Sequence, residues 1–170
     1  TLHELLALFT SKNIEYTTAH LDTVNQNAQL TDVASDSREV TPGSLFVCKG
    51  AHFSPAYLAS AVEAGAAAYL CQQSLAEKLQ AVAPNVAAIC VDDVRLAMAY
   101  AAAGVAGHPD KKLTTIGITG TKGKSTCSYM LRAILDGDEP YSKCGVIGGI
   151  EVFDGKDTQP AHNTTPEAPE

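Results

Sequence analysis

Thr115-Ile-Gly-Ile-Thr-Gly-Thr-Lys-Gly-Lys-Ser-Thr126 is a β-branched run that breaks into a glycine-rich turn and ends on a lysine followed by two hydroxyl residues. The run predicts a strand, and Cys127-Ser-Tyr-Met-Leu-Arg-Ala-Ile-Leu135 after it predicts a helix. A turn of this kind presents bare backbone amides and a helix N-terminus to phosphate oxygens. The stretch therefore predicts an ATP-binding loop.

Within this loop, Lys124 is expected to neutralise phosphate charge and the Ser125 hydroxyl to ligate Mg²⁺. The strict pattern G-x-x-x-x-G-K-[ST] fails, because Ile118 occupies its first glycine position. The alternative is an ordinary strand-turn-helix with incidental glycines, but the flanking strand and helix pattern favours the ATP site. The residues expected to bind ATP are Gly120, Thr121, Lys122, Gly123, Lys124, Ser125 and Thr126.

Composition narrows the class of protein. The chain has 170 residues, is 45% hydrophobic and carries a net charge of −7, which argues against a nucleic-acid partner. No segment approaches the ~20 apolar residues needed to span a bilayer, so no membrane partner is expected. The amino end, Thr1–Thr10, contains Glu4 and predicts an amphipathic helix rather than a secretory signal. We expect a cytoplasmic monomer whose five scattered cysteines are reduced thiols rather than zinc ligands.

Short β-like runs alternate with alanine-rich helical ones up to about residue 107, which predicts a mostly parallel or mixed sheet flanked by helices. The polar stretch Gly107–Lys112 contains Pro109 and predicts a boundary, with one domain over 1–108, a second over 109–170 and a separate core in each. Leu113 onward predicts a strand, a helix, a turn at 136–140, a strand near 143–147 and then mostly loop. The alternating runs are Leu45–Cys48, Tyr57–Glu63, Ala66–Cys71, Ser74–Val82, Val86–Val91 and Val94–Val105.

Three polar segments carry further chemistry. Asp36-Ser-Arg38 precedes a Pro-Gly turn and could simply satisfy loop amides. Lys49-Gly-Ala-His52 follows a predicted strand at the edge where α/β sheets bind ligands, although a lone histidine is more often structural. Asn163-Thr-Thr-Pro-Glu167 is a polar turn that could contact a sugar or carbonyl, or cap a helix.

Taken in order, these segments resemble one family. Asp36-Ser-Arg38, the Pro42–Val47 run, the glycine loop and Asn163–Glu167 are similar to motifs of the Mur ligases of peptidoglycan synthesis. Within the family they are most similar to the tripeptide synthetases, MurE. Folylpolyglutamate synthetases usually end the loop Gly-Lys-Gly-Ser, and the relative MurF lacks a typical Asn-Thr-Thr-Pro-Glu segment.

The resemblance implies an α/β fold in which an N-terminal mixed-sheet UDP-binding domain is followed by the beginning of a P-loop ATPase domain, the Mur ligase central domain, truncated. It implies an ATP-dependent amide ligase that adds meso-diaminopimelate or L-lysine to UDP-N-acetylmuramoyl-L-alanyl-D-glutamate. ATP would convert a carboxylate into an acyl phosphate, which the amine of the diamino acid attacks.

The resemblance also assigns residues. Ser37 and His52 would contact the UDP moiety, and Asn163, Thr164 and Thr165 the muramoyl-peptide part of the substrate. No catalytic residue is assigned, and the diamino-acid site would lie in a carboxyl-terminal domain outside this chain. The chain alone is thus expected to be an inactive fragment, the alternatives being a stand-alone nucleotide-binding or regulatory paralogue, another Mur ligase such as MurF, or a small phosphate-loop kinase or GTPase.

Overall fold

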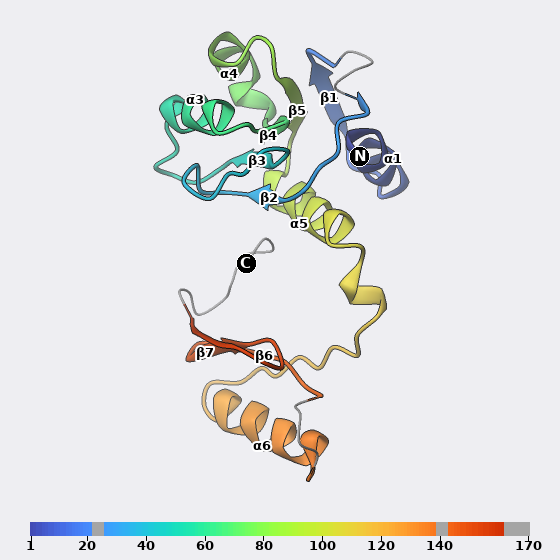
Figure 1. Cartoon of the computed structure of the whole chain (residues 1–170), viewed down its shortest axis with the longest axis vertical. Helices are drawn as coiled ribbons and strands as arrows, with labels where there is room; N and C mark the ends of the chain where they lie inside the picture. Colours follow the sequence, from blue (N-terminus) through green and yellow to red (C-terminus); the bar gives the residue numbers. More distant parts are fainter. Residues whose placement is uncertain (22–25, 139–142, 162–170) are drawn as a thin grey trace. The chain divides into compact units, whose positions relative to one another are not determined.

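The computed structural model describes residues 1–21, 26–138 and 143–161. These residues divide into two units, the first spanning Thr1–Leu113 and the second beginning at Thr114 (Figure 1). Each unit is described by itself. In the described parts of the chain, no helix is both long and apolar enough to cross a membrane.

A five-stranded mixed sheet organises the first unit, with the strand order β1-β5-β4-β3-β2. Strands β2 to β5 run parallel, and β1 pairs antiparallel with β5 at one edge. The predicted mixed sheet flanked by helices is therefore confirmed. The strands are β1 (Tyr16–Ala19), β2 (Val33–Ala34), β3 (Leu45–Cys48), β4 (Ala68–Gln72) and β5 (Ala87–Val91).

The helices begin where their sequences supply caps. Thr1 and Glu4 form a reciprocal capping box at the first helix, and Ser54 caps a helix whose first residue is proline. Asp93 Oδ1 accepts a hydrogen bond from Leu96 N at 3.0 Å at the start of another. The helices are α1 (Leu2–Ser11), α3 (Pro55–Glu63), α4 (Ala76–Val82) and α5 (Val94–Val105), with short 3-10 turns η1 (Gln73–Leu75) and η2 (Pro109–Lys111).

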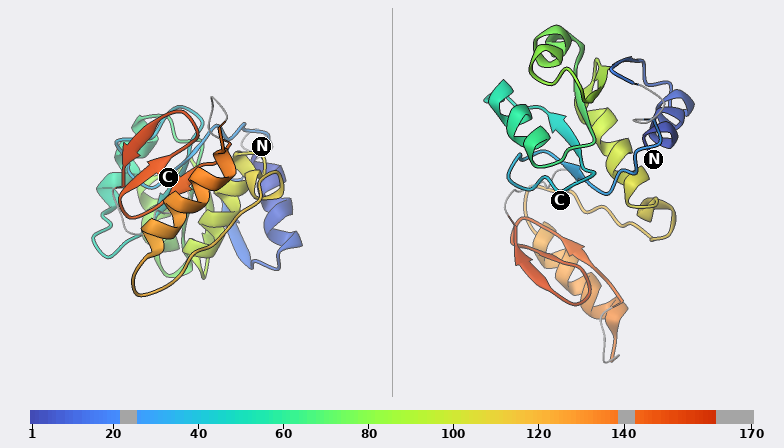
Figure 2. Two further views of the ribbon diagram at one scale, coloured as in Figure 1. Left: turned by 90° about the horizontal axis from the view of Figure 1, so that it is seen from below. Right: turned by 45° about the horizontal axis from the view of Figure 1, so that its top comes forward.

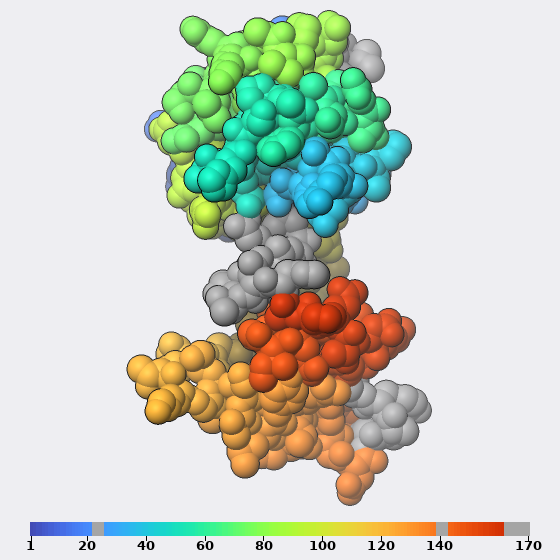
Figure 3. Space-filling view, turned by 90° about the vertical axis from the view of Figure 1, so that its left-hand side faces the viewer, coloured from blue at the N-terminus to red at the C-terminus, as the bar shows by residue number. Residues whose placement is uncertain are grey.

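Strand alternation divides the core of the first unit into two layers. Leu45 and Val47 of β3 face α1 and α5, whereas Phe46 and Cys48 face α3 and α4. Helices accordingly lie on both faces of the sheet (Figure 2), and side chains of α3 and α4 close over their layer (Figure 3). All four residues of β3 are buried, so side chains packed on both faces of the sheet hold this strand in place.

The second unit combines α6 (Lys124–Asp136) with an antiparallel sheet of order β6-β7-β8. The Arg132 guanidinium lies 3.6 Å from the Phe153 ring centroid, and its Nε donates to Asp136 Oδ2 at 3.3 Å. Asp136 Oδ1 also accepts from Lys143 N at 2.8 Å, which links the end of α6 to the segment that leads into β6. The strands are β6 (Val146–Ile147), β7 (Glu151–Phe153) and β8 (Thr158–Pro160).

One prediction for the second unit is wrong. The strand predicted from the β-branched run at Thr115 does not form, because no described strand pairs with residues 114–120 and Ile116 is largely exposed. After β6, most of the described residues lie outside strands, as predicted, but β7 and β8 form a hairpin that the sequence did not predict. Asp154 Oδ1 accepts from Lys156 N and Asp157 N, each at 2.8 Å, and closes the hairpin turn.

Candidate functional sites

The parallel strands of the first unit all send their following loops to one edge of the sheet. Asp36–Arg38 follows β2, Lys49–Phe53 follows β3, η1 follows β4, and Asp92–Asp93 follows β5. Carboxyl ends of parallel strands are the usual ligand-binding edge of an α/β sheet. A ligand at this edge can therefore contact loops that are far apart in the sequence.

Asp36 and Arg38 fix the turn that carries Ser37. Asp36 Oδ1 accepts from Arg38 N at 2.9 Å, and both carboxylate oxygens accept from the Arg38 guanidinium. These hydrogen bonds lower the pKa of Asp36 to about 2, the side-chain bond from Arg38 being the largest cause. Ser37 thus lies in a turn that is stabilised by the ion pair between its two neighbours, Asp36 and Arg38.

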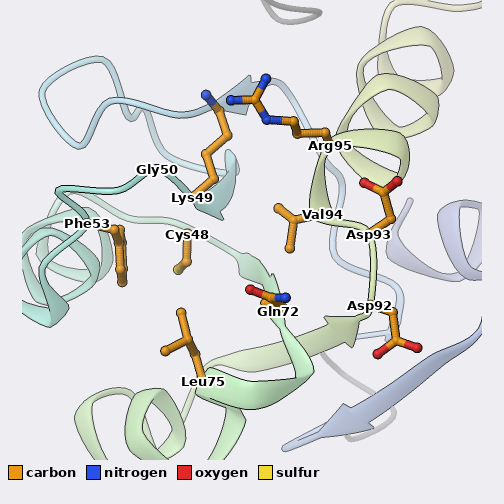
Figure 4. A pocket seen from close by; sticks show the side chains of 10 residues that line it. All are labelled: Cys48, Lys49, Gly50, Phe53, Gln72, Leu75, Asp92, Asp93, Val94 and Arg95. Atoms are coloured by element: carbon orange, nitrogen blue, oxygen red, sulfur yellow. The ribbon is translucent and has the colours of Figure 1, made fainter.

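A cavity of about 490 Å³ opens at the same edge (Figure 4). Lys49 extends from the end of β3 and Arg95 from the first turn of α5, and both side chains reach toward the same side of the cavity. The Phe53 ring and the Gln72 amide provide an apolar surface and a hydrogen-bonding group. The lining residues are Cys48, Lys49, Gly50, Phe53, Gln72, Leu75, Asp92, Asp93, Val94 and Arg95.

This lining suits a phosphorylated aromatic ligand. Two cations supply charge for an anion, an aromatic ring can stack on a base, and an amide can read a base edge. The volume also falls in the range of small-molecule sites, ~300–1,000 Å³. In Figure 4, Asp92 lies away from the ends of the cationic side chains, and Asp93 lies beside the start of α5.

The structure brings two of the predicted substrate-binding residues to this edge and places neither in the cavity. Ser37 and His52 lie on the loops after β2 and β3, but neither lines the cavity. Asn163, Thr164 and Thr165 lie outside the described residues. Gln72 and Arg95 were not singled out by the sequence, although each stands directly at the end of a predicted strand or the start of a predicted helix.

The glycine loop lies at the N-terminus of α6 in the second unit. Gly123 is the N-cap residue with φ of +79°, a conformation that glycine adopts without strain. A glycine N-cap has no side chain to bond the amides of the first helical turn, and an added Cβ there would meet nothing within 4 Å. Backbone amides at such an open end favour anions.

Lys124 folds back over the loop. Its Nζ donates to Gly120 O at 2.7 Å, so the cation is held above the glycine turn and not extended away from it. Ser125, in the first turn of α6, is half-buried, whereas Thr121, Lys122 and Thr126 are exposed.

The residues at this loop fit a nucleotide phosphate with a divalent cation. A hydroxyl is a hard oxygen ligand of the kind Mg²⁺ takes together with phosphate oxygens. Among the described residues, no group of three His, Cys, Asp or Glu side chains could hold a metal alone. A metal bound here together with the nucleotide would neutralise phosphate charge.

Comparison with known proteins identifies relatives. No family model matches the chain. It is 37% identical over 146 residues to the UDP-N-acetylmuramoyl-L-alanyl-D-glutamate–2,6-diaminopimelate ligase of Caldanaerobacter subterraneus, covering 85% of this chain and 29% of that protein. It is 37% identical over 137 residues to the UDP-N-acetylmuramyl-tripeptide synthetase of Bifidobacterium longum, covering 80% of this chain and 25% of that protein.

A solved structure shares the fold. The crystal structure of MurF from Acinetobacter baumannii superposes with a TM-score of 0.54 at 24% identity, covering 77% of this chain and 26% of that one. The chain thus spans between a quarter and a third of the length of these relatives. The sequence identity to the two synthetases, together with the shared fold, shows that the chain belongs to the Mur ligase family and resembles MurE over most of its length.

Proposed function

We propose that this chain is the amino-terminal part of an ATP-dependent amide ligase of peptidoglycan precursor synthesis. The ligase would add meso-diaminopimelate or L-lysine to UDP-N-acetylmuramoyl-L-alanyl-D-glutamate in the cytoplasm. The observation that carries the proposal is the identity of about 37% to the diaminopimelate ligase and the tripeptide synthetase along most of the chain. The 170 residues alone would bind substrates without completing the reaction.

In this proposal the predicted first domain, residues 1–108, binds the UDP end of the substrate. Support comes from the carboxyl-edge cavity, where Lys49 and Arg95 can neutralise a diphosphate and Phe53 and Gln72 can contact a base. Ser37 and His52 stand on neighbouring loops of the same edge and would contact the parts of the nucleotide that extend beyond the cavity.

Residues 109–170 would form the beginning of the ATP-binding domain. Gly120–Thr126 would hold the phosphates, with Lys124 neutralising charge and Ser125 as a Mg²⁺ ligand. The position of Lys124 Nζ above the loop supports this role, because a phosphate oxygen can replace Gly120 O as its acceptor. The segment with Asn163, Thr164 and Thr165 would contact the muramoyl-peptide portion.

The UDP proposal is tested by titrating the chain with UDP and following backbone amide shifts by NMR. We expect shifts at residues 36–38, 49–54, 72 and 95. Arg95→Ala should weaken binding by about tenfold, roughly 1.4 kcal/mol, because it removes a charge-assisted contact. Lys78→Ala, an exposed lysine of α4 outside the cavity, is the matched control. Shifts only at distant residues, or none at millimolar UDP, would refute the proposal.

The ATP proposal is tested separately with Mg·ATP. Lys124→Ala should remove the amide shifts of Gly120–Thr126 seen on titration, whereas Lys156→Ala, an exposed lysine on the β7–β8 turn, should leave them unchanged. Retention of the shifts in the Lys124 variant would show that the loop binds the nucleotide without Lys124, which would refute the role proposed for that residue.

A further inference from the structure

Three cysteines form a row across the sheet of the first unit. Cys48 of β3 lies directly opposite Cys71 of β4, and Cys71 lies directly opposite Cys90 of β5. All three side chains point to the layer covered by α3 and α4, and each residue is at most 1% exposed. The three thiols therefore lie side by side on neighbouring strands, near the carboxyl edge of the sheet.

Cys71 and Cys90 are the close pair in this row. Their sulfur atoms are 3.6 Å apart, and the Cys71 thiol donates to the Cys90 sulfur. A disulfide needs its sulfurs about 2 Å apart and its Cα atoms roughly 4.4–6.8 Å apart. Neighbouring strands lie about 4.8 Å apart, within that range. A bond between the two sulfurs thus requires side-chain rotation and a small strand adjustment, not a rearrangement of the sheet.

The hydrogen bond also makes the two thiols differ in acidity. Accepting the hydrogen bond from the Cys71 thiol lowers the pKa of Cys90, and this effect outweighs burial, which acts in the opposite direction. The same interaction raises the pKa of Cys71, with burial adding to it. Cys90 is therefore the sulfur that carries negative charge first, which is the form that reacts with oxidants.

Cys90 borders a second cavity, of about 610 Å³, together with Thr17 and Gln73, although the residue itself is only 1% exposed. Polar groups on the cavity wall, such as the Thr17 hydroxyl that donates to Gln73 Oε1 at 2.8 Å, can accommodate a small polar molecule. A hydroperoxide is small and polar enough to enter this cavity, and it would reach the buried Cys90 sulfur when the side chains around the cavity move.

We propose that Cys71 and Cys90 are a reversible oxidation site that forms a disulfide when a small hydroperoxide reaches Cys90. The Cys90 thiolate attacks the peroxide, the O–O bond breaks, and Cys90 becomes a sulfenic acid as hydroxide leaves and takes up a proton. The Cys71 sulfur then attacks the Cys90 sulfur and gives up its proton, and the sulfenic oxygen leaves as water. In total two thiols and one hydrogen peroxide give one disulfide and two waters.

Oxidation would change the wall of the first cavity. Gln72 follows Cys71 directly, Asp92 lies two residues after Cys90, and Cys48 is itself part of the wall. Drawing the sulfurs of β4 and β5 together moves the ends of both strands, from which Gln72 and Asp92 extend. The disulfide itself does not depend on the proposed UDP site.

The test uses the 170-residue chain with Cys127→Ser and Cys144→Ser, which removes the exposed and the half-buried thiol. After treatment with hydrogen peroxide, intact mass should fall by two hydrogens, two of the three remaining thiols should resist alkylation, and peptide mapping should link Cys71 to Cys90. Dithiothreitol should restore the original mass. Amide signals of Gln72 and Asp92 should shift on oxidation and return on reduction.

Cys71→Ala and Cys90→Ala in this background identify the pair. Neither variant should lose two hydrogens, and Cys71→Ala should accumulate an oxidised Cys90. The proposal is overturned if the parent keeps three free thiols under peroxide, if the bond joins Cys48 to Cys71, or if Cys90 gains oxygen without a disulfide. These readouts are taken on the parent chain, so they stand even if a variant fails to fold.

Discussion

Replacing Tyr69 with phenylalanine should stabilise the first unit. Tyr69 lies in β4 with no exposed surface, and its hydroxyl has no hydrogen-bond partner among the residues that the structure describes. A buried polar group without a partner costs about 1–3 kcal/mol. Phenylalanine keeps the packed ring and removes the hydroxyl. We therefore expect the free energy of unfolding to rise by about 1–2 kcal/mol.

The measurement is urea and thermal unfolding of the chain followed by circular dichroism. For a unit of this size, 1 kcal/mol corresponds to a rise of roughly 4 °C in Tm. Tyr57→Phe is the matched control, because Tyr57 is about half-exposed and its hydroxyl reaches solvent. The control should stay within about 0.5 kcal/mol of the parent chain.

The effect of the Tyr69 substitution should grow at high pH. Burial raises the pKa of Tyr69, with neighbouring cysteines adding to the shift. An unfolded tyrosine loses its proton near pH 10, so above that pH the folded state binds more protons than the unfolded state and stability falls as pH rises. The phenylalanine variant lacks this loss. If Tyr69→Phe instead lowers the free energy of unfolding by 1 kcal/mol or more, the hydroxyl has a hydrogen-bond partner in solution and the reasoning is refuted.

Three further predictions follow from the described contacts. Leu70→Ala, at a fully buried position of β4, should lower the free energy of unfolding by about 2–5 kcal/mol in urea titration. Arg38→Ala should raise the pKa of Asp36 from about 2 toward the ordinary ~4, which NMR titration of that carboxyl group will measure. Because the pKa of Asp36 is lowered in the folded state, the stability that this carboxylate contributes is lost as pH falls from about 4 to 2. Gly65→Ala should lower Tm, because φ is +99° and a Cβ would lie 3.2 Å from Pro42 Cα; an unchanged Tm would contradict it.

The elements of the first unit could be predicted because their signals are local. The helix predicted over Val94–Val105 forms with those bounds, since Asp93 supplies a cap and Ala97 and Ala101 lie on its buried face. The buried strand at Leu45–Cys48 is likewise a continuous apolar run. The antiparallel pairing of Tyr16–Ala19 with β5 was not specified, because pairing depends on residues about 70 positions away.

The second unit shows where local signals mislead. The β-branched run at Thr115–Ile118 has strand propensity, but a strand also needs a partner, and among the described residues none pairs with it. The β7–β8 hairpin, by contrast, has a local signal in its sequence. Asp154-Gly155 is a strong turn dipeptide, and Gly155 adopts φ of +104° there.

The two candidate sites also differ in how far the sequence alone could predict them. The glycine loop could be found because its residues are contiguous. The carboxyl-edge cavity could not, because Lys49, Gln72 and Arg95 come from three separate loops and meet only through the strand order. A sequence pattern gives the position of each loop but not which strands are neighbours. Ser37 and His52 were identified by family resemblance, and their contacts with a substrate remain predictions.

The two candidate sites also differ in how firmly the fold holds them, and ionic strength can separate them. The cavity is bordered by β3 and β5, which are buried along their whole length, so its loops are fixed before a ligand arrives. Helix α6 has no fully buried residue, and the charge of Lys124 is exposed. Binding of ATP at the loop should thus depend mainly on charge, which salt screens over about 10 Å at 0.1 M. UDP in the cavity would add contacts to Phe53 and Gln72 that salt does not weaken. Raising the salt concentration should therefore reduce ATP affinity more steeply than UDP affinity in parallel NMR titrations, and equal salt dependence would show that the cavity binds UDP by charge alone.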